Sequence, residues 1–357
     1  MRKKILIDLT NLSNPTCGFG QIAANYEKNA SSFFQDGVEV LFLMPQKGEI
    51  KPQPNIVYIK TNKIYKIFKF LLPKVNVWHS TNQQYRYLRL TRSTSQVLTI
   101  HDLNFVSEKS SLKVMLKLKK LQYRVNHAAV ITAISNYAAE ELKKHIDLKG
   151  KDIITIYNGV ERIDQAESIK PRFVNTERPF FFTLGQVRKK KNFHVLIDVM
   201  KNFPEYDLYI SGQDHYEYAK EIRQRILNEK TKNVFLTGTI KNEEKIWLYK
   251  NCTAFLFPST LEGFGLPVIE AMQFGRAVFS SNFTSLPEVC GGNAFIWDNF
   301  DPDYMSQMIK EHLKSFYEDE QKIVKMKEYA FSFSYEKHIQ QYVAIYKALL
   351  KEKKSYQ

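Results

Sequence analysis

The chain has 357 residues, 44% of them hydrophobic and 25% charged, which is typical of a globular protein with two domains. Its net charge of +15 at pH 7 indicates an acidic partner: nucleic acid, an anionic membrane or an anionic substrate. Cys17, Cys252 and Cys290 lie far apart, which excludes a local metal-ligand motif and favours a reducing compartment over a disulfide framework.

The first expected element is a strand at 4–9, which contains Asp8 and is too short and too polar to be a signal peptide. A loop follows, in which Gly18 and Gly20 let backbone N–H groups come close to a diphosphate. A single G-x-G spacing also fits an ordinary turn, so both interpretations stay open. We then expect a helix at 21–35 and a strand at 38–44.

The region after the next strand, at 55–60, is basic, because no acidic residue occurs between Glu49 and Asp102. Residues 62–72 alternate lysines with large apolar side chains at helical spacing, and the apolar ones share a face: Ile64, Ile67, Phe68 and Leu71. Such a basic amphipathic helix is typical of membrane-surface binding. A surface helix that packs one face on the core has the same pattern. A second basic stretch, 112–124, can extend this surface, and no apolar run approaches the length of a membrane span.

Two expected strands end at histidines, 75–78 at His79 and 96–100 at His101. Ligands bind at the carboxyl ends of strands in open α/β sheets, so His101 is a candidate site residue and His79 a weaker one. Asp102 is expected to orient the loop backbone or His101. A strand at 129–134, a helix at 136–145 and a strand at 153–157 follow.

A polar segment without periodicity, from about 161 to 178, separates a second domain from the first. The second domain starts with a strand at 179–184, and four consecutive cations follow it: Arg188, Lys189, Lys190 and Lys191. In a strand-to-helix loop, such a run favours an anionic ligand. A diphosphate is the natural choice, since Lys and Arg both neutralise phosphate charge. The alternative is a solvated run of charge.

The stretch 253–270 combines an aromatic strand, a glycine-containing loop and a helix that starts at Pro267. The helix dipole and the N–H groups near its start favour a phosphate beside Phe264, Gly265 and Leu266.

Two carboxylates flank this loop. Glu262 follows the strand and can hold sugar hydroxyls, whereas Glu270, in the first turns of the helix, can accept hydrogen bonds from a ribose diol. The spacing equally fits a solvated Glu262 and a Glu270 that stabilises the helix dipole.

The segment E-G-F-G-L-P-V-I-E at 262–270, with F-P-S before it and L-P-E-V after it, resembles the E-x7-E signature of retaining glycosyltransferases of family 4. This resemblance implies the α/β class and the GT-B fold, in which two Rossmann-like domains face each other across a cleft. It implies an acceptor-side domain at 1–170, to which a terminal helix at about 335–357 returns. The domain that binds the nucleotide sugar then covers 171–334.

The resemblance also implies roles for residues of the donor site. Glu270 holds the ribose, and Lys191 neutralises the diphosphate together with Arg188 or Lys190. Lys191-Asn192 matches the end of a family element, whereas Gln186 stands where many members carry arginine, so the partner of Lys191 stays open.

The implied catalytic residues are His101, Glu262 and Lys191, and the loop with Gly18 and Gly20 approaches the donor from the first domain. Glycosyl transfer passes through an oxocarbenium-like transition state, in which cations and helix N–H groups stabilise the charge that grows on the β-phosphate. No metal or other cofactor is therefore expected. Same-face attack and double displacement both fit retention, and Glu262 is the only nearby carboxylate to consider as a nucleophile.

The tripeptide Asp301-Pro302-Asp303 matches a metal-binding D-x-D, but we expect Asp303 to cap a helix instead. The opening I-D-L-T-N-L, H-D-L at 101–103 and L-P-E-V resemble a branch with bacterial O-antigen mannosyltransferases. This favours GDP-mannose as donor, followed by a UDP-hexose, and a glycan or lipid-linked glycan of the cell envelope as acceptor. The basic surface favours a peripheral position on the inner face of the cytoplasmic membrane and no nucleic acid.

Two other classes of function remain. Charge alone fits a nucleic-acid-binding protein, although the chain has no recognisable nucleic-acid-binding module. The GT-B fold also occurs in enzymes that are not transferases, such as nucleotide-sugar epimerases and phosphorylases.

Overall fold

The computed structural model describes residues 2–14, 18–33, 37–47, 52–108, 110–174 and 177–352. The chain divides into two compact units, Met1–Gly159 with Phe333–Gln357 and Val160–Ser332. The boundary at Gly159 precedes the polar segment at 161–178, and the last helix belongs to the first unit.

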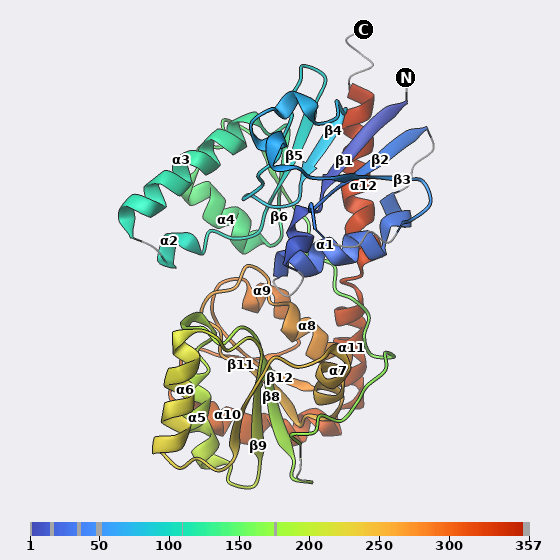
Figure 1. The fold of residues 1–357 in the computed structure, drawn as a ribbon. Helices are drawn as coiled ribbons and strands as arrows, with labels where there is room; N and C mark the ends of the chain where they lie inside the picture. Colours follow the sequence, from blue (N-terminus) through green and yellow to red (C-terminus); the bar gives the residue numbers. More distant parts are fainter. Residues whose placement is uncertain are drawn as a thin grey trace. The chain divides into compact units, whose positions relative to one another are not determined.

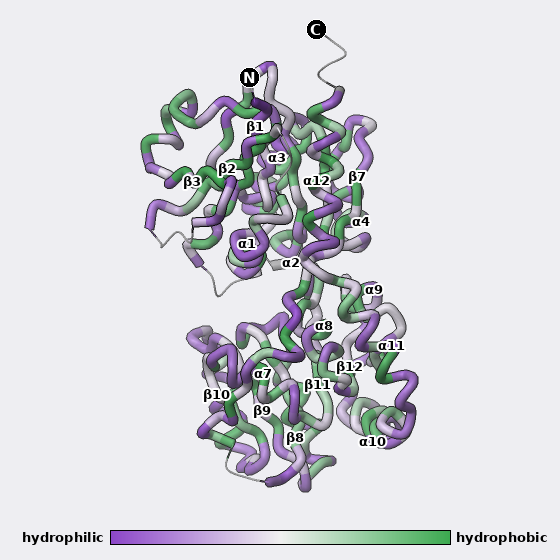
Figure 2. The backbone as a smooth tube through the Cα atoms, turned by 90° about the vertical axis from the view of Figure 1, so that its right-hand side faces the viewer, coloured by the Kyte–Doolittle hydropathy of each residue, from purple (hydrophilic) through white to green (hydrophobic). Residues whose placement is uncertain are grey.

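The first unit is built on a parallel sheet of seven strands in the order β3-β2-β1-β4-β5-β6-β7 (Figure 1). The strands are β1 (Lys3–Asp8), β2 (Val38–Met44), β3 (Ile56–Lys60), β4 (Val77–Ser80), β5 (Ser95–Ile100), β6 (Val130–Ala133) and β7 (Ile153–Thr155). Hydrophobic stretches of the chain coincide with strands such as β2 and β3 (Figure 2). The strand order reverses between β1 and β4, where ligands bind in doubly wound sheets.

One face of this sheet is covered by α1 (Gly18–Lys28), η2 (Ala30–Phe33) and the terminal helix α12 (Tyr335–Glu352), drawn in red beside the blue strands in Figure 1. Ile339, Tyr342 and Tyr346 of α12 join the same buried cluster as Ile5 and Phe42 of the sheet. The terminal helix is therefore part of the core of the first unit.

The opposite face is covered by α3 (Ser111–His127) and α4 (Asn136–His145) over one half and by irregular segments over the other. Two short 3-10 turns, η3 (Lys63–Lys66) and η4 (Lys69–Leu71), and a loop through Tyr87 and Leu88 pack there against Trp78. The remaining short elements of the unit are η1 (Thr10–Ser13) and α2 (Phe105–Glu108).

The second unit has a parallel sheet of six strands in the order β10-β9-β8-β11-β12-β13. The strands are β8 (Phe180–Leu184), β9 (Asp207–Ser211), β10 (Val234–Gly238), β11 (Ala254–Phe257), β12 (Ala277–Ser281) and β13 (Phe295–Trp297). The helices are η5 (Lys189–Lys191), α5 (His194–Val199), η6 (Met200–Asn202), α6 (Glu217–Asn228), α7 (Asn242–Asn251), α8 (Leu266–Gln273), α9 (Leu286–Cys290), α10 (Pro302–Glu318) and α11 (Glu320–Phe331). The order reverses between β8 and β11, so the predicted α/β class with two Rossmann-like domains is confirmed.

Three local predictions were wrong. Residues 62–72 form two 3-10 turns and not one helix, because the Asn62 side chain accepts from the N–H of Ile64 and the Arg89 guanidinium binds the carbonyl oxygens of Phe70 and Leu72. The first α-helix ends at Lys28, before a separate 3-10 turn at 30–33, where we expected one helix at 21–35. The end of the expected helix, at 34–35, lies outside the described residues.

The third concerns the D-x-D spacing. Asp301, and not Asp303, caps α10: its Oδ1 accepts from the N–H of Tyr304 at 2.9 Å. Pro302 is then the first helical residue, a position where the missing N–H of proline costs nothing.

Candidate active site

The switch point of the second sheet brings together the loops that follow β8 and β11. Gly185, directly after β8, donates its N–H to the carbonyl oxygen of Ser211 at 3.0 Å. The backbone of Gly212 passes close to Gly185 and has a φ of +137°, and a Cβ on Gly212 would lie 2.0 Å from the Gly185 carbonyl oxygen. Only glycine allows this close crossing, which holds the loop before the cationic run.

The ion pair between Lys191 and Glu262 joins the two loops. The side chains are 11% and 14% exposed, so the pair lies at the base of the site and not on open surface. The Lys191 ammonium also lies 4.8 Å from the centre of the Phe257 ring, and its stem packs where a side chain on Gly185 would be. The structure thus brings two of the predicted catalytic residues into direct contact.

Backbone contacts fix the spacing of the same loops. The carbonyl oxygen of Lys190 accepts from Ser259 Oγ at 3.0 Å and from the N–H of Thr260 at 2.8 Å. The N–H of Glu262 donates to Thr284 Oγ1 at 3.0 Å, and Ser285 Oγ donates to the carbonyl oxygen of Phe264 at 3.1 Å. Thr284 and Ser285 were not predicted as part of the site, since their hydroxyls act from a loop that follows β12.

The loop ends at Gly265, which caps α8 with a φ of +109°. Pro267 lies in the first turn, as the sequence predicts. The first-turn N–H groups of a helix have no intrahelical partners, so the start of α8 offers donors and a partial positive charge next to Lys191 and Glu262. Phe264 is buried and Leu266 opens the helix, which places this predicted phosphate-binding segment at the edge of the sheet.

Glu270, on α8, is held by two residues of α7. Lys245 Nζ lies 3.0 Å from one carboxylate oxygen, and Tyr249 OH donates to the other at 2.9 Å. Burial raises the pKa of Tyr249 well above its ordinary value, and the charge of Glu270 adds to this, so the hydroxyl stays protonated and donates. Lys245 and Tyr249 are one helical turn apart, but no local pattern indicates that their face meets Glu270.

The two possible partners of Lys191 differ in their surroundings. Arg188 is exposed and its guanidinium carbon lies 4.7 Å from the centre of the Tyr216 ring, whereas Lys190 is half-buried and anchors the loop through its carbonyl oxygen. Which of them contacts a diphosphate stays a prediction.

In the first unit, His101 follows β5 and is buried at 4% exposure. Its Nε2 lies 2.8 Å from the carbonyl oxygen of Thr81, and its backbone N–H donates to Gln83 Oε1 at 3.1 Å. A carbonyl oxygen can only accept, so Nε2 carries the proton and Nδ1 has a lone pair. Burial lowers the pKa of His101 to about 4, which makes the ring neutral at pH 7.

Gly18 and Gly20 lie in the first turn of α1 and not in a loop as predicted, while Cys17 lies outside the described residues. Between them, the Phe19 ring meets His101 edge-on, with the ring centres 4.6 Å apart. The start of α1 and His101 are therefore neighbours. His79 is fully buried instead, with Nδ1 2.6 Å from Tyr346 OH and Nε2 2.9 Å from Thr99 Oγ1. It is therefore a structural residue of the core.

Asp102 orients loop backbone, since its carboxylate accepts from the N–H of Asn104 at 3.0 Å. No helix among the described residues has the length and apolar character to cross a membrane.

Comparison with known families finds glycosyltransferases along both units. Residues 35–162 match the family described as "Glycosyltransferase Family 4", and residues 164–333 match "Glycosyl transferases group 1". The chain is 28% identical over 214 residues to a serotype-specific mannosyltransferase, WbdA, of Escherichia coli, an alignment that covers 54% of this chain and 26% of that protein. The chain thus spans about a quarter of the length of this relative. It is 25% identical over 256 residues to the O-antigen chain mannosyltransferase B of the same species, covering 67% and 65% of the two chains.

Solved structures share the fold. Sucrose-phosphate synthase from Thermosynechococcus elongatus superposes with a TM-score of 0.75 at 17% identity, over 98% of this chain and 100% of that one. Anabaena HepE, solved in complex with UDP and glucose, has a TM-score of 0.68 at 16% identity over 98% and 100%. With family models matched along both units and the fold of these structures, the chain belongs to the GT-B glycosyltransferases of group 1 and family 4.

Proposed function

We propose that this chain is a retaining hexosyltransferase that uses GDP-mannose, with a UDP-hexose as the second candidate donor. Its acceptor is a glycan or lipid-linked glycan of bacterial envelope polysaccharide, reached at the inner face of the cytoplasmic membrane. The observation that carries the proposal is the Lys191–Glu262 pair beside the start of α8, at the switch point of the second sheet.

The donor fits this arrangement group by group. The diphosphate lies against Lys191 and the first turn of α8, with Arg188 or Lys190 as a second cation. Lys191 exchanges part of its contact with Glu262 for phosphate oxygens, which frees the Glu262 carboxylate to accept from sugar hydroxyls. The ribose diol donates to Glu270, whose two oxygens are fixed by Lys245 and Tyr249.

The chemistry needs no metal in this proposal. As the bond between the anomeric carbon and the β-phosphate breaks, negative charge grows on the phosphate, and prealigned cations and N–H groups stabilise that charge more than the ground state. Retention follows from attack on the face that the phosphate leaves, with the departing phosphate as base. In this proposal Glu262 accepts from sugar hydroxyls and does not act as the nucleophile.

His101 acts in this proposal as a neutral hydrogen-bonding group. Its protonated Nε2 is used by Thr81, so Nδ1 is the atom left to accept from a sugar hydroxyl. Because burial lowers the pKa of His101 to about 4, the pH profile of transfer should have no limb from this histidine near pH 6.5.

The choice of donor is supported by relatives. The curated proteins named above are mannosyltransferases, two of them of the O-antigen, and this favours mannose. The HepE structures hold UDP and UDP-glucose, which keeps a UDP-hexose as the second choice.

The test is a thermal-shift panel with GDP, UDP, ADP, CMP and dTDP, with and without EDTA. A nucleotide at 100 times its Kd stabilises its unit by about 2.7 kcal/mol, and we expect one diphosphate to do so in both conditions. Glu270→Ala should abolish the shift, whereas Glu270→Gln keeps one acceptor and should only weaken it. No shift with any nucleotide, from folded protein, contradicts the donor site.

Product analysis separates the other enzyme classes. Donor incubated without acceptor yields a new nucleotide sugar if the protein is an epimerase, and absorbance reveals pyridoxal phosphate if it is a phosphorylase. Binding to DNA with a steep salt dependence would instead support a nucleic-acid-binding protein.

A further inference from the structure

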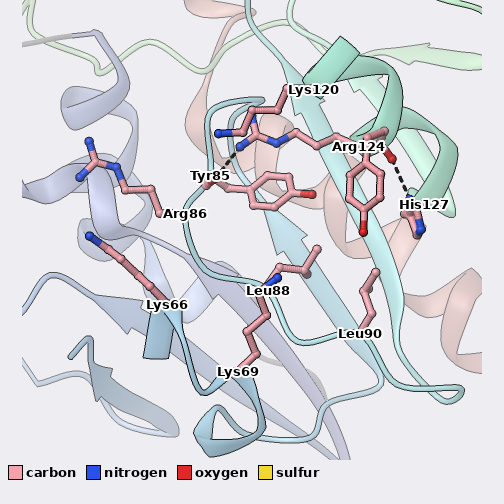
Figure 3. Close-up of a pocket in the computed structure, with 10 residues that line it drawn as sticks. Lys66, Lys69, Tyr85, Arg86, Leu88, Leu90, Lys120, Arg124 and His127 are labelled. Carbon is pink, nitrogen blue, oxygen red and sulfur yellow. Dashed lines mark hydrogen bonds between the residues drawn. The ribbon is translucent and has the colours of Figure 1, made fainter. Parts of the chain in front are cut away.

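A pocket of about 560 Å³ opens in the first unit, on the sheet face that carries η3 and η4 (Figure 3). Its walls come from these two turns, from the loop at 85–90 and from the second half of α3. It is separate from His101 and the start of α1, which do not line it. The site therefore joins the two basic stretches at 62–72 and 112–124, and the loop at 85–90 completes it.

The pocket is strongly cationic. Its lining includes five cations and no carboxylate: Lys66, Lys69, Arg86, Lys120 and Arg124. Between residues 50 and 139 the chain has 15 lysines and arginines and only two acidic residues, Asp102 and Glu108. This quarter of the chain thus carries +13 of the net charge of +15.

The cations are close enough to repel one another. The neighbouring charge of Arg124 lowers the pKa of Lys120, and burial and Arg86 add to the effect. Within the described residues, Lys69, Arg86 and Lys120 form no ion pair, so no described carboxylate offsets this repulsion. A bound anion would do so.

The Arg124 guanidinium is held in place by neighbouring groups of the chain. Arg124 donates to the carbonyl oxygens of Gln83 and Tyr85, the latter at 2.7 Å, and its guanidinium carbon lies 4.4 Å from the centre of the Tyr85 ring. Figure 3 shows Arg124 laid along Tyr85, with Lys66 and Arg86 extending to one side and Lys120 above. Arg124 anchors the loop, and the exposed cations around it are available to a ligand.

The rim of the pocket is apolar and exposed. Ile67, directly after η3, is 77% exposed, and Phe70, in η4, is 64% exposed. Each follows a residue that lines the pocket, Lys66 or Lys69. Tyr123, which lines the pocket on α3, is 63% exposed. Exposed apolar side chains beside a cationic hollow fit a lipid surface better than a soluble anion, since they enter the acyl layer while phosphates meet the cations.

We propose that this pocket binds the phosphate headgroups of anionic lipids, with Ile67, Phe68 and Phe70 inserted between the acyl chains. The inference rests on the membrane attachment in the proposed function, and it assigns that attachment to three exposed cations and an apolar rim. It does not depend on the donor site of the second unit.

The experiment measures sedimentation of the full chain with vesicles of phosphatidylcholine containing 30% phosphatidylglycerol. The pocket variant is Lys69→Gln/Arg86→Gln/Lys120→Gln. The control variant, Lys232→Gln/Lys250→Gln/Lys347→Gln, removes the same charge from exposed lysines elsewhere. At about 1 kcal/mol for each cation, the pocket variant should bind about 100-fold more weakly than the wild type, and the control variant within about threefold of it. Equal losses in the two variants would overturn the pocket as a site.

A second variant, Ile67→Ser/Phe70→Ser, separates a lipid from a soluble phosphate. It should lose vesicle binding but keep the thermal shift that pyrophosphate gives to the wild type and not to the pocket variant. Vesicle binding at wild-type strength in this variant would overturn the lipid as the ligand. The nucleotide shifts of the second unit should be unchanged in every variant, so a failure of the proposed function is recognised independently.

Discussion

Lys191 and Glu262 form an ion pair in the loops that follow β8 and β11, so each side chain compensates the charge of the other in the absence of a donor. In this partly buried position, removing one partner leaves the other charge without compensation. A ligand that brings negative oxygens to Lys191 can replace Glu262, and the released carboxylate can then serve the sugar. In the proposed function, the pair therefore couples diphosphate binding to sugar binding.

The first prediction, at this scale, is that Lys191→Met lowers kcat/KM by about 100- to 1000-fold, or about 3–4 kcal/mol, as the loss of one transition-state donor does. Methionine keeps the stem that packs on Gly185 and removes the ammonium group, which lies over the Phe257 ring. The measurement is transfer rate with the donor that the thermal-shift panel identifies. Lys189→Met, an exposed neighbour on the same turn, is the matched control and should retain activity within a few-fold.

Thermal unfolding distinguishes catalysis from folding in that experiment. Lys191→Met should lower Tm, and the double variant Lys191→Met/Glu262→Gln should recover part of it because no charge is left unpaired. The double variant should stay inactive. Recovery of activity together with Tm would mean that Lys191 is structural only.

At the scale of elements, the donor site depends on how the loop after β11 enters α8. Gly265 takes a φ of +109°, and a Cβ there would lie 2.7 Å from Leu286 Cδ2 on α9. The hydroxyls of Thr284 and Ser285 hold the same loop, so α9 and its preceding turn set the position of the start of α8.

The second prediction is that Gly265→Ala destabilises the second unit by about 1–3 kcal/mol and weakens nucleotide binding, because it combines backbone strain with a steric clash. Gly292→Ala is the control: its φ of +76° gives the same kind of strain, but nothing lies within 4 Å of the added Cβ. Denaturant unfolding and nucleotide titration measure both effects. Equal losses in the two variants would show that the contact with Leu286 does not matter.

The terminal helix is the element on which the first unit depends. Besides its apolar side chains, α12 supplies the hydroxyl of Tyr346 to His79 at 2.6 Å and that of Tyr342 to Thr99 at 2.9 Å. Without the helix, these polar groups and the part of the sheet face that α12 covers lose their partners.

The third prediction is that a chain ending at Ser332 has an unfolded first unit. Removing several large core side chains, each worth about 1.5–3 kcal/mol, exceeds a typical domain stability of about 5–15 kcal/mol. Hydrogen exchange should find β1 and β4 unprotected and β8 and β11 protected. Protected amides in β1 would contradict this dependence.

At the scale of the whole molecule, the two units should respond differently to acid. Burial lowers the pKa of His79 to about 3 and those of His101 and His338 to about 4, and all three lie in the first unit. Below their ordinary pKa of 6.5 the unfolded chain binds protons that the folded unit does not, so stability falls as the pH falls from 6.5 toward 4. Asp8 opposes this, because burial raises its pKa from 3.8 to about 6 and the folded unit therefore binds its proton first.

The fourth prediction is a net uptake of about two protons on unfolding of the first unit, which lowers its stability by about 2–3 kcal/mol per pH unit between about pH 6 and 4.5. Hydrogen exchange of β4 and β5, corrected for intrinsic rates, measures it, with β8 and β11 as internal reference. Asp8→Asn keeps the acceptor for the N–H of Thr10 and removes the opposing proton, so it should steepen the loss. Equal protection at pH 7 and 5 would contradict the buried neutral histidines.

The sequence by itself determined most of the strands and the order of the elements. Apolar runs bounded by glycine and proline predicted the strands, and the rule that parallel strands share a carboxyl edge placed the cations at 188–191, Glu262 and Glu270 at one side of one domain. These inferences hold because they depend on short stretches of chain and on a topology with few alternatives.

Only the tertiary structure decided which of these groups touch. It paired Lys191 with Glu262, set Lys245 and Tyr249 against Glu270, and gathered the pocket cations from three distant segments. It also broke the helix that the pattern at 62–72 predicts, because Arg89, well along the chain, binds the carbonyl oxygens of its last turn. A periodic pattern records which side chains prefer burial, whereas a contact between distant residues depends on how whole elements pack, and no single stretch of sequence contains that information.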